Sequence, residues 1–318
     1  MIAASLVDNL LTAPVVAFVV ALAATLVRFD LRLPESLYPI LSTYLLFAIG
    51  LKGGRALSTS DAGDIWQPLV AAVVLGVVTP LVAYAAFKWG AAIGRLDAAA
   101  IAAHYGSVSA VTFTVALATL DAREIAYEGH VAGLLAILEV IGIIVALSIA
   151  RDGGDRGRFA EAVGEVLRGR SIAFLLAGLV TGLVVGDDRL APVDPLFVGL
   201  FSGALVLFLL EMGAIAAERL RDVRTAGWRL AALAVVVPVV NGVLGAVAGD
   251  LAGLSTGGVA IMATLAASAS YIAAPAAVRI ALPEASPGLY VTASLGITFP
   301  FNLIVGIPFF IRLAESLT

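Results

Sequence analysis

The sequence lacks cysteine altogether and holds only two histidines among its 318 residues. The absence of cysteine excludes disulfides, thiolate metal sites and cysteine nucleophiles. Two histidines leave very little for a histidine-rich metal site. Charged residues are scarce, at 13% where soluble domains carry about 25%, and a net charge of −4 is too small to indicate a nucleic-acid partner. No G-x-x-x-x-G-K-[ST] motif occurs, so nothing indicates a built-in ATP-driven motor.

Apolar residues are abundant instead: they make up 61% of the chain, and the mean hydropathy is +1.06. A transmembrane helix needs about 20 mainly apolar residues, and continuous runs of this kind recur along the whole chain. We therefore predict an all-α integral membrane protein that is embedded in the lipid bilayer by ten helices. The expected spans are 12–28, 36–53, 65–88, 97–119, 127–150, 171–187, 195–217, 226–249, 257–280 and 288–313.

The basic residues are distributed unevenly between the connecting loops. Fourteen of the nineteen Lys and Arg fall in the first, third, fifth, seventh and ninth loops. The other five fall in the remaining loops and at the two ends of the chain. Because cytoplasmic loops carry the excess of Lys and Arg, these alternate loops are expected to be cytoplasmic. Both termini are then outside, and the protein is a multi-pass protein of the cell (inner) membrane.

The two halves of the chain resemble one another. Residues 151–170 form the only long polar stretch, and they separate five spans (1–150) from five more (171–318). Trp66 matches Trp228 at an offset of 162, while Ser107 matches Ser268, and Arg151 matches Arg312, at 161. Halves with an odd number of spans insert in opposite directions, and such inverted repeats are typical of secondary transporters. The sequence thus predicts two inverted five-helix repeats joined by a cytoplasmic linker.

The fourth and ninth spans have small and hydroxylated residues at their centres. They read AHYGSVSAVTFTVA and LAASASYIAAPAAV, and Pro275 removes a backbone donor from the second. Interrupted helices at membrane depth occur where backbone groups line a cavity or are buried in protein, and helix N-termini that meet there attract anions. The alternative is close helix packing, which also favours Ser, Ala and Gly. The candidate hydroxyl ligands for an anion or a small cation are Ser107, Ser109, Thr112, Ser268 and Ser270.

Two carboxylates lie well inside predicted spans, Glu139 and Glu211. An ionisable group at that depth costs a few kcal/mol unless it is paired or wetted, and it indicates an ion or proton pathway. We expect both to take part in coupling, although Glu211 lies nearer a charged helix end. His104 is interpreted either as a hydrogen-bonded core residue or as a gate.

Three stretches resemble the sodium-dependent bicarbonate transporter family, best known from cyanobacteria, and its non-cyanobacterial branch of bicarbonate transport permeases. They read GSVSAVTFTVALATLDAREIAYEGH with the following LAILEVIG, AASASYIAAPAAVRIALPEASPGLYV, and TFPFNLIVGIPFFIRLAESL. The resemblance covers nearly the whole chain. It implies that the broken fourth and ninth helices cross in a core domain of helices 3–5 and 8–10, beside a gate domain of helices 1, 2, 6 and 7. It also implies a homotrimer in which the core moves against the gate as an elevator.

The resemblance further implies that the chain takes up bicarbonate with Na⁺ as the coupling ion, without another cofactor and without enzyme activity. Gly106, Ser109 and Thr112 match the family's site motif in helix four, and Ser268 and Ser270 match that in helix nine. Glu139 stands where cyanobacterial members have aspartate. The implied substrate site is Gly106, Ser107, Ser109, Thr112, Ser268, Ala269 and Ser270, and the implied cation or coupling groups are Ser109, Glu139, Glu211, Ser270 and Tyr271.

The chain also departs from the cyanobacterial pattern. Ala269 and Tyr271 replace a serine and an aspartate at the break in helix nine, and the central loop is shorter than the one near which a PII-like regulator acts in cyanobacterial members. Two alternatives therefore stand beside bicarbonate uptake. One is H⁺- or Na⁺-coupled transport of another small monoanion or carboxylate through Glu139, and the other is a membrane anion sensor that transports nothing. An intramembrane hydrolase needs a placed nucleophile and base, for which only Ser107 and His104 lie near one another in sequence.

Overall fold

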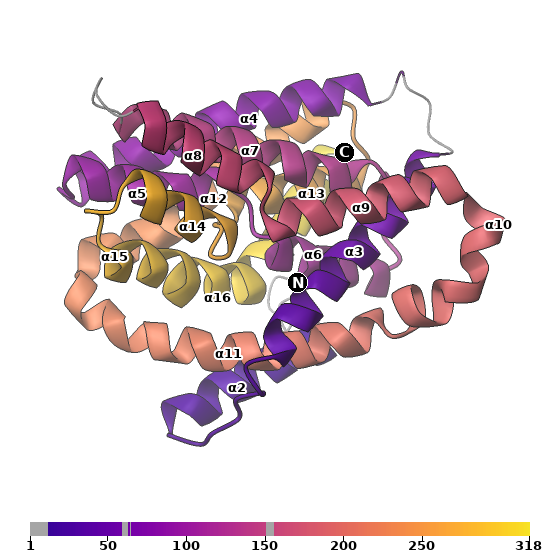
Figure 1. The fold of residues 1–318 in the computed structure, drawn as a ribbon, viewed down its shortest axis with the longest axis horizontal. Coiled ribbons are helices and arrows are strands. Elements are labelled where there is room, and N and C mark those ends of the chain that lie inside the picture. Colours follow the sequence, from indigo (N-terminus) through magenta and orange to yellow (C-terminus); the bar gives the residue numbers. More distant parts are fainter. Residues whose placement is uncertain (1–11, 59–62, 64, 151–155) are drawn as a thin grey trace.

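The computed structural model describes residues 12–58, 63, 65–150 and 156–318. Helices account for most of these residues and no strand occurs among them, which confirms the predicted all-α class. Figure 1 shows the helices gathered side by side, with the long α11 (Phe201–Ala226) along the edge opposite α4 (Trp66–Ala85). The expected match of Arg151 with Arg312 cannot be followed, because Arg151 lies outside the described residues.

Each of the ten apolar segments expected from the sequence contains helical residues, and two of them are interrupted. In the described part of the chain, seven helices are long and apolar enough to cross a membrane, or up to eight if a bent pair counts as one span. This confirms a multi-pass membrane protein. The count of ten spans stays a prediction. The seven are Leu37–Leu57 (α3), Trp66–Gly90 (α4 with η2), Arg95–Ala122 (α5 with α6), Val131–Ala150 (α7), Phe201–Val223 (in α11), Trp228–Leu251 (α12) and Pro287–Leu317 (α15 to α17).

Two segments are interrupted where the sequence places small and hydroxylated residues. The first consists of α5 (Arg95–Gly106) and α6 (Ala110–Ala122), and the second of α13 (Thr256–Ala267) and α14 (Ala273–Ala281). The residues after the first helix of each pair, Ser107 and Ser268, have extended backbones. Serine competes for backbone hydrogen bonds and favours helix ends, which is why the helices stop there.

The helices fall into two packing units. In the core unit, α4, α5 and α7 pack on one another, α12, α13 and α17 (Ile307–Leu317) do likewise, and α4 meets α12. In the flanking unit, α2 (Ala13–Leu26) packs along α11, and α3 packs along α9 (Arg170–Val185). The units touch mainly where α11 meets the π-helical segment η5 (Thr292–Thr298).

The α3–α9 pair is in backbone contact. A Cβ atom on Gly50 would lie 2.1 Å from the carbonyl oxygen of Leu175, and one on Gly178 would lie 2.2 Å from that of Phe47. Each helix carries a second glycine four residues on, in the G-x-x-x-G spacing that lets membrane helices approach closely. Such contact leaves little freedom for one helix to slide along the other.

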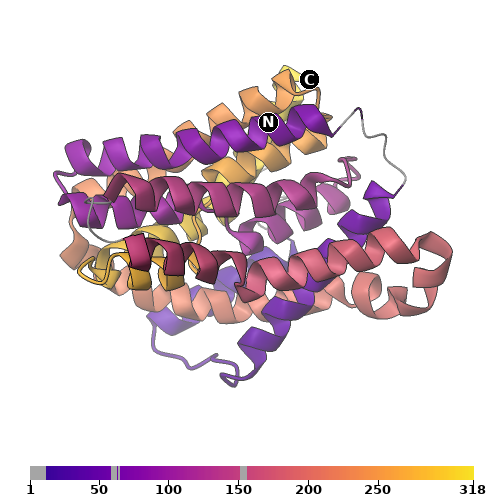
Figure 2. The ribbon, with the colours of Figure 1, turned by 45° about the horizontal axis from the view of Figure 1, so that its top comes forward.

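The polar stretch between the halves contains a helix that the sequence analysis did not predict. Helix α8 (Arg156–Leu167) packs on α14 and α7, and it leads into α9 through a bend of 40°. Figures 1 and 2 both show α8 and α9 as one bent rod across the molecule. Ala162 and Val166 are buried. Their spacing of four residues puts both on one helix face, so the segment is amphipathic rather than an open loop.

Candidate functional site

The two breaks are bound to one another by reciprocal hydrogen bonds. The amide of Ser109 donates to the hydroxyl of Ser268 at 2.8 Å. In the other direction, the amide of Ser270 donates to the carbonyl oxygen of Ser107 at 3.1 Å and to that of His104 at 2.7 Å. Because the backbone polar groups of a broken helix have lost their helical partners, these bonds are what makes the two breaks stable at this depth.

Serine hydroxyls cap both helices that begin at the breaks. The hydroxyl of Ser109 accepts from the amide of Thr112 at 3.2 Å at the start of α6. The hydroxyl of Ser270 accepts from the amide of Ala274 at 3.3 Å at the start of α14, where Pro275 follows without a donor to satisfy. Two positive helix ends therefore lie at the breaks, with amides in each first turn that have no partner inside their helix.

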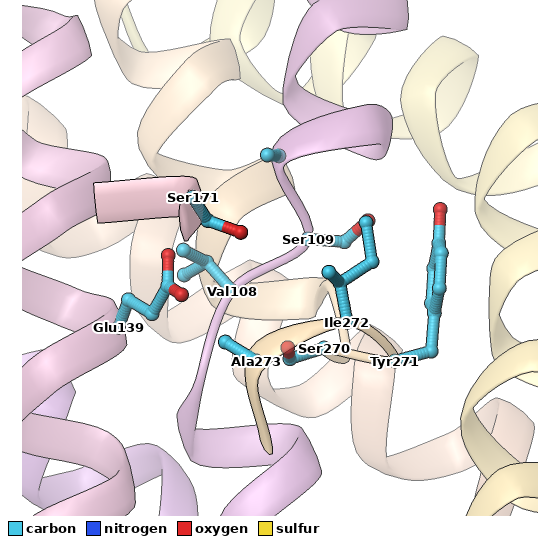
Figure 3. Close-up of a pocket in the computed structure, with 9 residues that line it drawn as sticks. Val108, Ser109, Glu139, Ser171, Ser270, Tyr271, Ile272 and Ala273 are labelled. Carbon is cyan, nitrogen blue, oxygen red and sulfur yellow. The ribbon is translucent and has the colours of Figure 1, made fainter. Parts of the chain in front are cut away.

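A small cavity, with room for about one water molecule and partly open to its surroundings, lies between these helix starts. Figure 3 shows Glu139 and Ser171 on the same side of the segment that joins α5 to α6, with Tyr271 at the opposite end of the lining. The lining combines two positive helix ends, several hydroxyls and one carboxylate. The lining residues are Val108, Ser109, Ala110, Glu139, Ser171, Ser270, Tyr271, Ile272 and Ala273.

The carboxylate of Glu139 is the one acidic group in this lining. Glu139 comes from the middle of α7, its residue is 2% exposed, and its side chain makes no hydrogen bond or ion pair with a described residue. A buried carboxylate without a partner is strongly unfavourable when ionised. An ionised Glu139 therefore needs water or a cation that reaches it through the cavity, and without either it holds a proton.

Tyr271 lies at the second break, beside Ser270. Its ring packs edge-on against Phe299, with the ring centres 5.2 Å apart. Its hydroxyl is buried near Ser109 in a geometry that fits no hydrogen bond. A phenol in this place offers a neutral oxygen, so Glu139 is the one described residue of the lining that supplies acidic charge.

Four of the predicted site residues line the cavity, and most of the others lie near the breaks without lining it. Ser109, Glu139, Ser270 and Tyr271 line the cavity. Gly106 has a packing role instead, since a Cβ atom there would lie 2.6 Å from the Cβ of Pro80. The remaining predicted residues are buried near the breaks without lining the cavity: Ser107, Thr112, Ser268 and Ala269.

Glu211 lies outside the cavity in an ion pair. Its carboxylate accepts from the guanidinium of Arg32 at 3.0 Å and from the amide of Leu33 at 2.7 Å, and Arg32 also pairs with Glu218 at 2.5 Å. These partners account for a buried carboxylate without any transported ion. A coupling role for Glu211 stays a prediction that the cavity geometry does not support.

His104 has the surroundings of a core residue. Its Nδ1 lies 2.7 Å from the carbonyl oxygen of Ala100, and its ring stacks on Tyr290 with the centres 4.5 Å apart. Its side chain does not line the cavity, and its carbonyl oxygen holds the amide of Ser270. Of the two interpretations of His104, the structure favours the hydrogen-bonded core residue over the gate.

Ser171 is the cavity residue that the sequence analysis missed. It is the second residue of α9 and directly follows the exposed Arg170. A serine in the first turn of an apolar helix is common, and nothing in its local sequence indicates that α9 begins beside the breaks. Only the three-dimensional packing of the two units brings it there.

The residues present suit a monovalent cation better than a transition metal. Within the described ranges, no group of three or more His, Cys, Asp or Glu is close enough to hold a metal ion. Hard cations take oxygen ligands, and Na⁺ in transporters is coordinated at the carbonyl ends of broken helices. The cavity lining offers oxygen atoms on Glu139, Ser109 and Ser270, although the helix ends beside them are N-terminal ones.

The comparison with protein families agrees with this geometry. Residues 13–315 match the family model described as the Na⁺-dependent bicarbonate transporter superfamily. No curated relative matches the chain. The match covers nearly the whole chain and both breaks, and its family is a class of transporters rather than of enzymes. The chain belongs to the Na⁺-dependent bicarbonate transporter superfamily.

Proposed function

We propose that this protein takes up bicarbonate by secondary active transport and that Na⁺ is the coupling ion. The observation that carries the proposal is the carboxylate of Glu139, which is buried and has no partner among the described residues. It lies in the cavity beside which α6 and α14 begin. The two positive helix ends and the hydroxyls of Ser109 and Ser270 would bind the anion. Na⁺ would lie beside Glu139.

Coupling follows from the charges in the cavity. An ionised Glu139 repels an incoming bicarbonate, because both are negative and the site is shielded from water. Na⁺ beside Glu139 removes that repulsion, so each ligand raises the affinity for the other, as linkage requires. Anion binding without Na⁺ is therefore disfavoured, which prevents uncoupled uptake.

The proposed architecture is ten spans in two inverted repeats, residues 1–150 and 171–318. Two observations support it. Ser109 and Ser270 each donate to the serine two residues before its counterpart, as a twofold relation predicts, although the acceptor is the hydroxyl of Ser268 in one bond and the carbonyl oxygen of Ser107 in the other. The flanking unit shows the same exchange, because α2 pairs with α11 as α9 pairs with α3.

The proposed movement is that of an elevator, in which the core unit carries the cavity past the flanking unit. The close backbone contact of α3 with α9 supports a flanking unit that moves as one body. The remaining parts of the proposal are a homotrimer in the cell (inner) membrane with both termini outside, and a PII-like regulator at the cytoplasmic face. They rest on the resemblance and on the distribution of arginine.

One alternative is supported by the same carboxylate. Glu139 without a partner can hold a proton as readily as Na⁺, and Tyr271 supplies no second acid for a cation. The protein would then couple H⁺ to the uptake of a small monoanion. Uptake driven by a pH gradient in the absence of Na⁺ would favour this alternative.

The test is uptake of labelled bicarbonate into proteoliposomes at fixed membrane potential and pH. An inward Na⁺ gradient is compared with choline in its place, and empty liposomes correct for the leak of dissolved CO₂. The proposal predicts accumulation that requires Na⁺ and is lost in Ser109→Ala. Equal uptake in Na⁺ and choline, in protein shown to be folded and inserted, would refute Na⁺ coupling.

A further inference from the structure

Among the described residues that line the cavity, one comes from outside the core unit, and that residue is Ser171. Val108, Ser109 and Ala110 belong to the first break, Glu139 to α7, and the rest to the second break. Ser171 lies in α9 of the flanking unit, which packs along α3. Whatever enters the cavity therefore meets both packing units at once.

The environment of Ser171 is that of a ligand-contacting group. The residue is 8% exposed although the preceding Arg170 is exposed. Its hydroxyl makes no hydrogen bond with a described residue. In Figure 3 this hydroxyl points toward the segment that links α5 to α6, on the side where Glu139 lies. The hydroxyl oxygen is not fully buried, so a group that enters the cavity can reach it and take that bond.

A second hollow supplies a contrast. It is equally small and reaches the start of α6 at Ala110 and Val111. It is also lined by a serine of the flanking unit, Ser42 in α3, but no carboxylate and neither capping serine lines it. Its other lining residues are Leu45, Leu46, Ala110, Val111, Thr114, Phe208 and Ile272. Ser42 is therefore a hydroxyl of the same unit without the polar surroundings of Ser171.

We propose that Ser171 is a further substrate-binding residue, whose hydroxyl donates to an oxygen of the bound oxyanion. The inference rests on the proposed function and assigns to that site a contact from the flanking unit. Since Ser171 lies in the first turn of α9, the contact exists only while that turn is level with the breaks. Movement of the core unit along α9 would break it, so Ser171 contributes to affinity on one side of the membrane.

The first test is the kinetics of bicarbonate uptake in oriented proteoliposomes. A hydrogen bond to a charged group is worth enough to raise KM about tenfold when lost. Ser171→Ala is expected to raise KM to that extent for the anion presented from one side, with a smaller change in kcat and in the KM from the other side. Ser171→Thr, which keeps the hydroxyl, should restore most of the affinity. Ser42→Ala and Thr181→Ala, the latter also in α9, are matched controls and should leave KM unchanged.

The second test uses the natural absence of cysteine. Val108→Cys, Ser171→Cys and Thr181→Cys each introduce a single thiol for a small methanethiosulfonate reagent, the first at a cavity residue that has no hydroxyl to bind the anion. Bicarbonate with Na⁺ should slow modification at positions 108 and 171 and leave position 181 unaffected. This readout does not depend on flux, so it applies to variants that transport poorly.

The outcomes separate this inference from the function on which it rests. Protection at position 108 without protection at 171, or an unchanged KM in Ser171→Ala beside a functional wild type, would overturn the role of Ser171 alone. Absence of Na⁺-dependent uptake in the wild type, together with absence of protection in Val108→Cys, would overturn the proposed function and this inference with it.

Discussion

The amide of Ser109 donates a 2.8 Å hydrogen bond to the hydroxyl of Ser268, a residue 159 positions further along the chain. With the returning bond from Ser270 to Ser107, this contact binds the start of α6 to the start of α14. Displacement of one helix start would break bonds to the other. The two positive helix ends therefore form a single binding element, although they come from opposite halves of the sequence.

Replacing the acceptor of this bond should weaken the site before it weakens the rest of the fold. Ser268→Ala leaves the buried amide of Ser109 without a partner, at a cost of about 1–3 kcal/mol. We expect a lower thermal unfolding temperature in detergent and a lower uptake rate. Ser148→Ala is the matched control, because that hydroxyl bonds only the carbonyl oxygen of Ile144 on an exposed face of α7. Equal stability of the two variants would contradict the structural role of Ser268.

The α3–α9 contact should tolerate no added atom. Gly178→Ala places a Cβ atom 2.2 Å from the carbonyl oxygen of Phe47, which cannot rotate away as a side chain would. The helices must separate, at a cost of about 3 kcal/mol. Gly203→Ala in α11 has open space around the new Cβ and serves as the control. Thermal unfolding in detergent should fall sharply for the first variant only, and a fall in both would show that the contact is not specific.

The ion pair of Glu211 should affect stability and leave coupling intact. Glu211→Gln weakens the bond to Arg32, which is 39% exposed at its side chain, so a loss of about 1 kcal/mol is expected. The Na⁺ concentration for half-maximal uptake should stay at the wild-type value, because Glu211 does not line the cavity. A large shift in that concentration would return Glu211 to the coupling groups.

The sequence was informative where polar residues or proline interrupt a span that is otherwise apolar. Hydroxyls and a proline at the centre of apolar spans, and a carboxylate at the depth of Glu139, are anomalous in themselves and indicated much of the cavity. Partners distant in sequence were not visible: Glu211 looked like Glu139 until Arg32, 179 positions away, proved to pair with it. Ser171 had no anomaly to reveal it, since its position depends on the packing of α9 beside the breaks. Helix α8 was missed because most of its residues are polar or small, and its two buried apolar residues, Ala162 and Val166, are too few to form a recognisable apolar run.

The most direct test of the account is the Na⁺ dependence of bicarbonate uptake in Glu139→Gln. The amide keeps the size of the side chain and removes the charge that Na⁺ would offset, and Glu161→Gln on the exposed face of α8 is the matched control. The account predicts that Glu139→Gln no longer accumulates bicarbonate in response to a Na⁺ gradient, while Glu161→Gln behaves as the wild type. Accumulation by Glu139→Gln with unaltered Na⁺ dependence would contradict the claim that this carboxylate couples the ion to the anion.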